Sequence, residues 1–256
     1  MSLSVYVIYH DLLNWENYKQ LEPEEFNLIT FVCVNKDLEK KTDFTPKRVI
    51  FEWELPVYDP NLQRKHVCDE TMVPKSHFNE TGVHWHLAVN KVCKTEYIYV
   101  CHNDMIFTQG SLKNIQSLLA PNKGITIART DFDTLVRTST YGEYDLSMYK
   151  YAVETLGVDT SKQFPLFTNC AMKTSLFEQQ MEKLIVVNKK LFMATLPGLW
   201  YRPAITFERT WALAMGNVLD EVIVVNGILH AHPPIDDVLR KTENGRVSQY
   251  PEFNRP

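Results

Sequence analysis

The chain has 256 residues, of which 45% are hydrophobic and 12% aromatic, so it can bury one large core or two small ones, and we expect one main domain. The formal net charge is −4 and no tract is rich in lysine or arginine, which argues against a nucleic-acid partner. No apolar run approaches the roughly 20 residues of a membrane span, and the five cysteines, mostly set in apolar runs, indicate reduced core residues. We therefore expect a soluble cytoplasmic protein.

The first half of the chain contains strand-like segments that end in polar residues. A strand over Leu3 to Tyr9 is followed by His10 and Asp11, and a strand over Phe26 to Val34 is followed by Asn35. Further elements are expected in the order strand, helix and strand, over residues 49–55, 81–92 and 97–101. Strands that alternate with helices predict an α/β sheet in which the polar strand ends share one edge and ligands bind beyond it.

The segment from Glu96 to Phe107, EYIYVCHNDMIF, is the most informative part of the chain. Tyr97 to Cys101 is typical of a central strand covered on both faces, and it ends in the polar triplet His102-Asn103-Asp104. Burying an unpaired carboxylate is costly, so we expect Asp104 to meet a cation, a hydrogen-bond donor or water at the strand end. The alternative is a strand followed by an ordinary turn.

The second half is predicted to continue the same alternation. A helix over 111–119, a strand over 124–128 and a strand leading into a helix over 170–184 come first. The polar segment Arg129 to Tyr151 resembles a long active-site loop with a helix at its end. A helix carrying Glu208 follows, then strands around Glu221 to Val225 and Gly227 to His232. The tail after Pro234 has few apolar residues and is expected to be peripheral.

Three residues in the last part of the chain are candidates for chemistry. Glu208 is at a helix N-terminus, where an ionised carboxylate is favoured and can accept a proton from a hydroxyl. The alternative is a surface carboxylate or an ion pair with Arg209 or Arg202. His230 and His232 lie on the same side of a strand, and either could supply a metal ligand. The alternative for them is a pair of core or surface histidines.

Short blocks of this sequence, in this order, resemble the GT-A superfamily of nucleotide-sugar glycosyltransferases. In that family a strand ends in an Asp-x-Asp-type motif that binds a divalent metal and the donor diphosphate, and EYIYVCHNDMIF is similar to it, with only Asp104 of the acidic pair present. RPAITFERTWAL is similar to the helix start that carries the catalytic base in inverting members, and ILHAH to the strand-end histidine of the metal site. The resemblance implies a Rossmann-like, mixed, mainly parallel central sheet flanked by helices.

A closer resemblance is to bacterial capsular-polysaccharide glycosyltransferase domains, in which a helix of the type Glu-Leu-Thr-Ala-x-Tyr-Trp precedes a strand with a histidine-led end. ETGVHW, NCAMKTSLF and FERTWAL are similar to segments of those domains. Similar domains occur in glycosyltransferases of large algal viruses, which would imply a host cytoplasm. The resemblance implies one domain over residues 1–256, with a nucleotide-binding half over about 1–110, an acceptor-binding half over about 111–235 and a tail over 236–256.

The resemblance also implies roles for individual residues. Asp104, with His230 or His232, would hold Mn²⁺ or Mg²⁺ against the donor diphosphate, and Mn²⁺ suits the mixed ligands better. Glu208 would deprotonate a glycan hydroxyl, with inversion at the anomeric carbon. The nucleotide-sugar donor, a UDP-sugar by family preference, would contact His10, Asp11, Asn35, Thr81, Trp85, His102 and Asn103. The acceptor would contact Asn169, Trp200 and Tyr201.

Two other functions are open at this point. A metal-dependent phosphohydrolase or nucleotidyltransferase would also place aspartate and histidine at strand ends, but it should show several clustered carboxylates. Asp131-Phe132-Asp133 is the only Asp-x-Asp pair. A non-catalytic sugar- or partner-binding module of the same fold would explain the incomplete acidic motif. The sugar, the nucleotide, the acceptor, the oligomeric state and the choice between inversion and retention are not determined.

Overall fold

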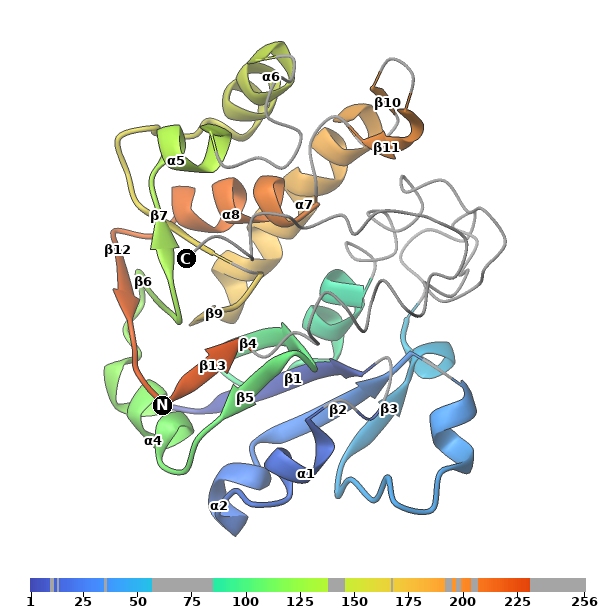
Figure 1. Cartoon of the computed structure of the whole chain (residues 1–256). Helices are drawn as coiled ribbons and strands as arrows, with labels where there is room; N and C mark the ends of the chain where they lie inside the picture. The colour runs from blue at the N-terminus through green and yellow to red at the C-terminus, as the bar shows by residue number, and fades with distance from the viewer. Residues whose placement is uncertain are drawn as a thin grey trace.

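The core of the structure is a seven-stranded mixed sheet (Figure 1). The computed structural model describes residues 1–9, 12, 14–34, 36–56, 85–137, 146–166, 168–191, 195–196, 199–203 and 207–230. The strand order is β12-β6-β9-β4-β1-β2-β3, and β9 alone is antiparallel to its neighbours. The strands are β1 (Leu3–Tyr9), β2 (Ile29–Cys33), β3 (Val49–Phe51), β4 (Tyr97–His102), β6 (Lys123–Thr126), β9 (Cys170–Lys173) and β12 (Glu221–Val224). The prediction of an α/β fold with a mainly parallel sheet is confirmed.

The central strands β1 and β4 are buried on both faces, which explains their almost continuous apolar sequences. Side chains alternate along β1, so that Tyr6 and Ile8 join one apolar cluster and Val5 and Val7 join another on the opposite face of the sheet. β4 follows the same rule beside it. The sheet therefore separates two cores, and successive residues of β1 and β4 contribute alternately to one core and to the other.

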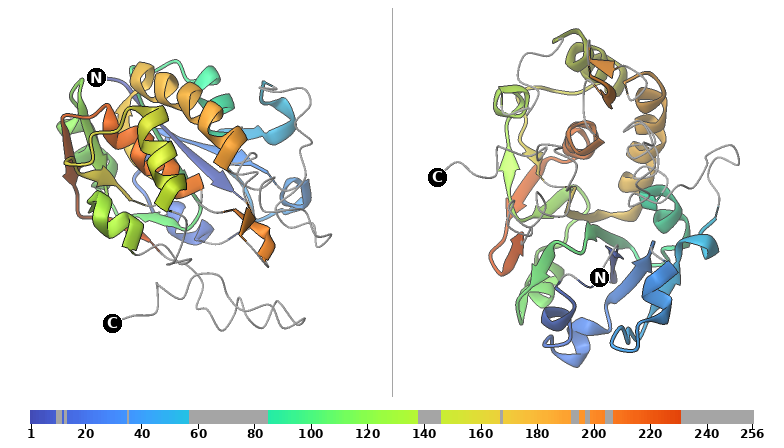
Figure 2. Two further views of the ribbon diagram at one scale, coloured as in Figure 1. Left: turned by 90° about the horizontal axis from the view of Figure 1, so that it is seen from above. Right: turned by 45° about the vertical axis from the view of Figure 1, so that its right-hand side comes forward.

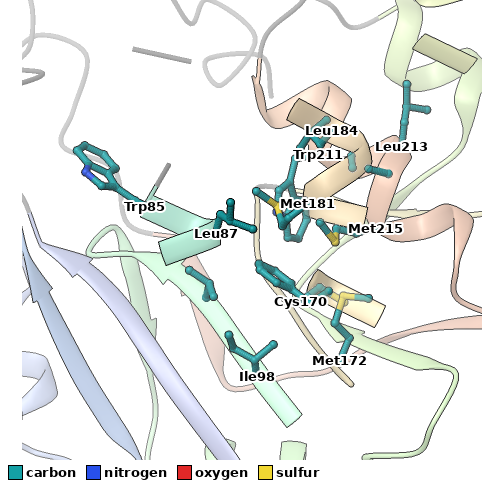
Figure 3. Close-up of a cluster of buried hydrophobic side chains, with 14 of the residues drawn as sticks. Trp85, Leu87, Ile98, Cys170, Met172, Met181, Leu184, Trp211, Leu213 and Met215 are labelled. Carbon is teal, nitrogen blue, oxygen red and sulfur yellow. The ribbon is translucent and has the colours of Figure 1, made fainter. Parts of the chain in front are cut away.

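The first core, here called the α7 cluster, lies between the sheet and a layer of helices (Figures 1 and 2). These helices are α5 (Phe132–Arg137), α6 (Leu146–Leu156), α7 (Thr174–Leu191), α8 (Phe207–Asn217) and the helix over residues 85–92. Met181 and Leu184 of α7 pack near Trp211 of α8 (Figure 3). Figure 3 also shows Ile98 of β4 on the sheet side of this cluster.

The second core, here called the α1 cluster, lies on the other face of the sheet. It is covered by α1 (Trp15–Tyr18), α2 (Pro23–Phe26) and α4 (Ser111–Leu118). Tyr9, Trp15 and Phe31 form edge-to-face contacts with centroids 5.3 to 6.1 Å apart. Tyr18 and Phe44 extend this group. The carboxyl end of β1 is thus packed in aromatic rings.

Three two-stranded sheets complete the described structure: β5 (Met105–Phe107) with β13 (Ile228–His230), β7 (Arg129–Thr130) with β8 (Phe164–Pro165), and β10 (Thr195–Leu196) with β11 (Leu199–Pro203). Short 3-10 segments are η1 (Lys36–Lys40) and η2 (Glu52–Glu54). Strands from both predicted halves of the chain belong to the central sheet. Among the described residues, no helix combines the length and apolarity needed to cross a membrane.

Two predicted strand boundaries were wrong. Pro23–Phe26 forms α2, because proline at the first helical position favours a helix, so β2 begins at Ile29 and not at Phe26. The third strand ends at Phe51, whose N–H donates to Glu54 Oε2 at 2.9 Å and turns the chain into η2. The segment from Arg129, predicted to be a long loop, begins with β7 and α5.

Candidate active site

The carboxyl ends of β1, β2, β3 and β4 lie along one edge of the sheet. The registers place Ile8 beside His102, Tyr9 beside Cys33, and Cys33 beside Phe51. In open α/β sheets, ligands bind beyond such an edge. Five predicted site residues lie outside the described residues: His10, Asp11, Asn35, Thr81 and His232.

Asp104 lies in the turn that follows β4. β4 ends at His102, Asn103 and Asp104 form the turn, and β5 starts at Met105. β13 runs antiparallel to β5 (Figure 1), and the register places His230 opposite Met105. The pairing of β13 with β5 therefore places His230, which comes late in the sequence, near the turn that carries Asp104.

A tight connection brings β13 to this turn. Gly227 has a φ of 91°, and a Cβ at this position would lie 2.8 Å from Thr108 Oγ1, so any other residue would strain both the backbone and this contact. The Gly227 carbonyl accepts hydrogen bonds from Thr108 N (2.7 Å) and Thr108 Oγ1 (2.8 Å). These bonds hold β13 against β5, although His230 and Asp104 are 126 positions apart in the sequence.

Asp104 and His230 are in direct contact. His230 Nε2 lies 3.0 Å from Asp104 Oδ2, and the side chains are 17% and 22% exposed for His230 and Asp104 respectively, so a solute can reach the pair. Two atoms that bind one metal ion at about 2.1 Å and at right angles are about 3.0 Å apart. An imidazole nitrogen and a carboxylate oxygen are also ligands that Mn²⁺ accepts. The 3.0 Å spacing is that of a hydrogen bond between the two side chains, and two ligands of one divalent ion would lie at the same spacing.

The described residues contain no group of three or more histidine, cysteine, aspartate or glutamate side chains that could hold a metal ion. Asp104 and His230 would thus supply two ligands within the described part of the chain. Divalent ions at phosphate sites commonly take one or two protein ligands and complete their coordination with water and substrate oxygens. Asp104 and His230 would form a site of this kind, with the other coordination positions left to water and substrate oxygens.

His102, the first residue of the predicted triplet, lies on the same face of β4 as Ile98 and Val100 of the α7 cluster. Its ring centroid lies 5.9 Å from that of His86, which is fully buried and stacks on Phe177 at 6.1 Å. Burial lowers the pKa of His102, and the Asp104 carboxylate opposes that shift. Burial, and secondly His102, hold the pKa of His86 well below its ordinary value. His86 is therefore neutral in the folded protein.

Acidification is expected to destabilise the fold through His86. The unfolded chain binds a proton at this histidine below a pKa of about 6.5, whereas the folded chain does not, so stability falls as the pH drops below that value. Between pH 7.5 and pH 5.5, His86→Phe should remove about 1 kcal/mol of the loss seen for wild type, measured by urea unfolding at both pH values. Equal losses in the two proteins would show that His86 is protonated in the native state.

Trp85 and Asn103, predicted to contact the donor, are buried. Trp85 belongs to the α7 cluster, and its Nε1 donates to Glu52 Oε1 at 3.0 Å. The Asn103 N–H donates to the carbonyl of Ile8 at 3.0 Å, which ties the turn to β1. Their described contacts support the fold, and a role in donor binding stays a prediction.

Asn169, predicted to contact the acceptor, is fully buried where β4, β6 and β9 meet. Its Oδ1 accepts from the hydroxyls of Tyr99 (3.1 Å) and Thr126 (3.2 Å), and its Nδ2 donates to the carbonyl of Leu166 at 3.0 Å. Both ends of the amide therefore join neighbouring segments of the sheet. This geometry makes Asn169 a structural link, and acceptor binding by it stays a prediction.

Glu208 lies in the first turn of α8, the helix predicted to carry it, at the end where the helix dipole favours an anion, and its side chain is exposed. The next residue, Arg209, donates from Nη1 to the carbonyl of Leu135 at 2.6 Å, near the end of α5. Trp200 and Tyr201 belong to β11, which precedes α8 in the chain. The roles of Glu208 as a base and of the two aromatic residues as acceptor contacts stay predictions.

Sequence reasoning missed two residues of this region, Asn14 and Tyr18. Asn14 Nδ2 donates to the carbonyl of Asn103 at 2.9 Å, and the hydroxyl of Tyr18 donates to the carbonyl of Met105. Asn14 immediately precedes α1, and Tyr18 is its last residue. Nothing in the sequence indicates what these two side chains contact.

No protein-family model and no curated protein matches the sequence. Among solved structures, the chain is similar to the bifunctional glycosyltransferase WbbM, with 9% identity and a TM-score of 0.44 over 88% of this chain and 39% of that one. WbbM and the two structures that follow are glycosyltransferases. The galactosyltransferase LgtC, solved with donor and acceptor sugar analogues, shows 7% identity and a TM-score of 0.45 over 90% of this chain and 88% of that one. The mannosyltransferase Ktr4p from S. cerevisiae shows 10% identity and a TM-score of 0.44 over 97% of this chain and 76% of that one.

These identities and TM-scores describe a distant similarity in backbone fold. The chain spans well under half of the length of WbbM. The substrates and chemistry of this chain therefore depend on the evidence of its own residues.

Proposed function

We propose that this chain is a glycosyltransferase that moves a sugar from a nucleotide-sugar donor, a UDP-sugar, to a hydroxyl of a glycan acceptor. The observation that carries the proposal is the contact between Asp104 and His230. The contact forms beyond the carboxyl end of β4, from the two blocks of sequence that resemble the metal-binding elements of GT-A enzymes. A chance pairing of residues 126 positions apart would not be expected to select these two.

Asp104 and His230 would hold the divalent ion, Mn²⁺ in preference to Mg²⁺, against the donor diphosphate. When bound, the ion neutralises negative charge that develops on the departing nucleotide. The two side chains are held in place by the turn after β4 and by the pairing of β13 with β5. The nucleotide would lie along the same sheet edge, near His10, Asp11 and Asn35.

Glu208 would act as the general base. Its carboxylate is exposed in the first turn of α8, and it would accept the proton of the acceptor hydroxyl. The hydroxyl oxygen then forms a bond to the anomeric carbon, while the bond from that carbon to the diphosphate oxygen breaks and its electron pair leaves with the nucleotide. Attack from the face opposite the leaving group inverts the anomeric configuration. Trp200 and Tyr201 would pack against the acceptor.

The proposal is tested with the purified chain and a panel of nucleotide sugars with Mn²⁺, scored by nucleotide release and by mass gain of glycan acceptors. We expect release with one donor, and we expect EDTA to abolish it. Glu208→Gln should retain donor binding and lose transfer by at least about 100-fold, because one general base contributes on the order of 10²–10⁴.

A donor that is bound but never turned over would favour the non-catalytic binding module. Phosphate release from simple esters without an acceptor would favour a phosphohydrolase. Turnover that EDTA leaves unchanged would contradict the role of the metal while leaving sugar transfer in place.

A further inference from the structure

The turn that carries Asp104 is held from one side by Asn14, which precedes α1, and by Tyr18, the last residue of α1. Asn14 Nδ2 donates to the carbonyl of Asn103 at 2.9 Å, and the Tyr18 hydroxyl donates to the carbonyl of Met105. These two carbonyls belong to the residues immediately before and after Asp104. The backbone on both sides of the carboxylate is therefore fixed by two side chains of one short segment.

The conformation of Asn14 allows its side chain to make this contact. It precedes α1 with a φ of 62° and makes no side-chain hydrogen bond that caps its own helix. Asparagine tolerates this left-handed conformation better than most residues. The amide points to the turn after β4, so the chain that leaves the carboxyl end of β1 also holds the neighbouring strand end.

The side chain of Tyr18 is also fixed in position. Its side chain is 1% exposed and makes edge-to-face contacts with Tyr9, Phe31 and Phe107, at centroid distances of 5.5 to 6.0 Å. The ring is held on several sides, so the hydroxyl has little freedom to turn away from the Met105 carbonyl. Burial raises the pKa of this phenol well above its usual range, so the group remains a donor.

We infer that Asn14 and Tyr18 are positioning residues that direct the Asp104 carboxylate toward His230. The inference on geometry stands on the described contacts, whereas its consequence for metal affinity rests on the proposed function. Residues that orient a metal ligand from behind typically change metal affinity by about 10- to 100-fold when they are removed. Neither residue would touch the ion or the substrate.

The test uses the full chain with Tyr18→Phe and Asn14→Gly. Phenylalanine removes only the hydroxyl, and glycine keeps the positive φ while removing the amide donor. Tyr97→Phe is the matched control, because Tyr97 lies at the opposite end of β4 and is also buried. Circular dichroism and urea unfolding confirm that each variant is folded.

The first measurement needs no metal. The ¹⁵N chemical shifts of the His230 ring, recorded at one pH, report its contact with Asp104. We expect Tyr18→Phe and Asn14→Gly to move these shifts toward those of Asp104→Asn, and Tyr97→Phe to leave them unchanged. Wild-type shifts in both folded α1 variants would overturn the inference.

The second measurement is Mn²⁺ binding, followed by the electron paramagnetic resonance signal of the free ion. Each α1 variant should bind Mn²⁺ about 10-fold more weakly than wild type and Tyr97→Phe. Equal affinity in all four proteins would overturn the link to metal binding. If wild type binds no Mn²⁺, the metal site of the proposed function fails, and the ring shifts still decide whether α1 positions Asp104.

Discussion

Asp104→Asn is expected to lower Mn²⁺-dependent nucleotide release by about 100-fold or more. Asparagine keeps the size of the side chain but removes the negative charge that attracts the ion, and a 100-fold loss corresponds to about 2.7 kcal/mol of transition-state stabilisation. The measurement is the initial rate of nucleotide release with the donor identified in the panel, at several Mn²⁺ concentrations. If the charge acts through the metal, raising Mn²⁺ should recover part of the rate.

His230→Gln provides a second arm of the same experiment. If both side chains hold one ion, the loss in the double variant should be smaller than the product of the two single losses, because the first substitution already weakens the shared site. Independent losses that multiply would contradict a shared site.

Asp133→Asn is the matched control for the loss of a carboxylate. Asp133 is exposed in the first turn of α5, and it belongs to the Asp-x-Asp pair that a phosphohydrolase would be expected to use. Its partner in that pair, Asp131, accepts the N–H of Thr134 at 2.7 Å and so serves the start of the helix. We expect wild-type turnover from Asp133→Asn. A loss equal to that of Asp104→Asn would contradict the assignment of Asp104 as the metal ligand.

The largest expected effect on stability comes from Glu25. This glutamate of α2 is fully buried, and its carboxylate accepts the N–H groups of Gly110 (2.7 Å), Leu112 (2.8 Å) and Lys113 (3.3 Å). Those groups belong to the start of α4, where a helix has no intrahelical acceptor for them. The negative charge also lies at the favourable end of the helix dipole. Glu25 thus caps α4 from a residue 85 to 88 positions earlier in the chain.

Glu25→Ala is expected to lower the free energy of unfolding by about 3 kcal/mol, because one buried and two part-buried N–H groups lose their acceptor and the helix loses its cap. Glu25→Gln, which keeps one acceptor oxygen, should cost about 1 to 2 kcal/mol. Urea unfolding monitored by tryptophan fluorescence gives both values. Glu24→Ala is the matched control, since Glu24 is exposed on the same helix, and it should change stability by less than about 0.5 kcal/mol.

A Glu25→Ala protein as stable as Glu24→Ala would show that the N–H groups at the start of α4 find other acceptors. That result would assign no stabilising role to the contact between α2 and α4. The intermediate value for Glu25→Gln separates the loss of the acceptor from the loss of side-chain volume.

The sequence predicted the elements that have a local signal. β1 and β4 were found because both faces of each strand are buried, which produces continuous apolar runs. The turn after β4 was found because a polar triplet interrupts such a run. The prediction failed where a local signal competes with another one, as at Pro23, which starts α2 and delays β2.

Contacts of the candidate site were predictable only in part. The sequence offered His230 and His232 equally, and within the described residues the register of β13 on β5 brings His230 to Asp104. Asn169 was predicted as an acceptor contact, and this role stays a prediction. A polar residue before a strand gives no sign that the hydroxyls of Tyr99 and Thr126 converge on it. The sequence alone cannot give such convergence, because it depends on which strands become neighbours.

By itself the sequence determined that the chain forms an α/β sheet and that Asp104 closely follows a buried strand, because apolar periodicity and polar strand ends are encoded over a few neighbouring residues. Only the tertiary structure decided that His230 meets this carboxylate and that Asn14 and Tyr18 hold its turn. These contacts join residues 87 to 126 positions apart. Their partners are selected by strand order, register and the packing of α1 on the sheet, which no local pattern specifies.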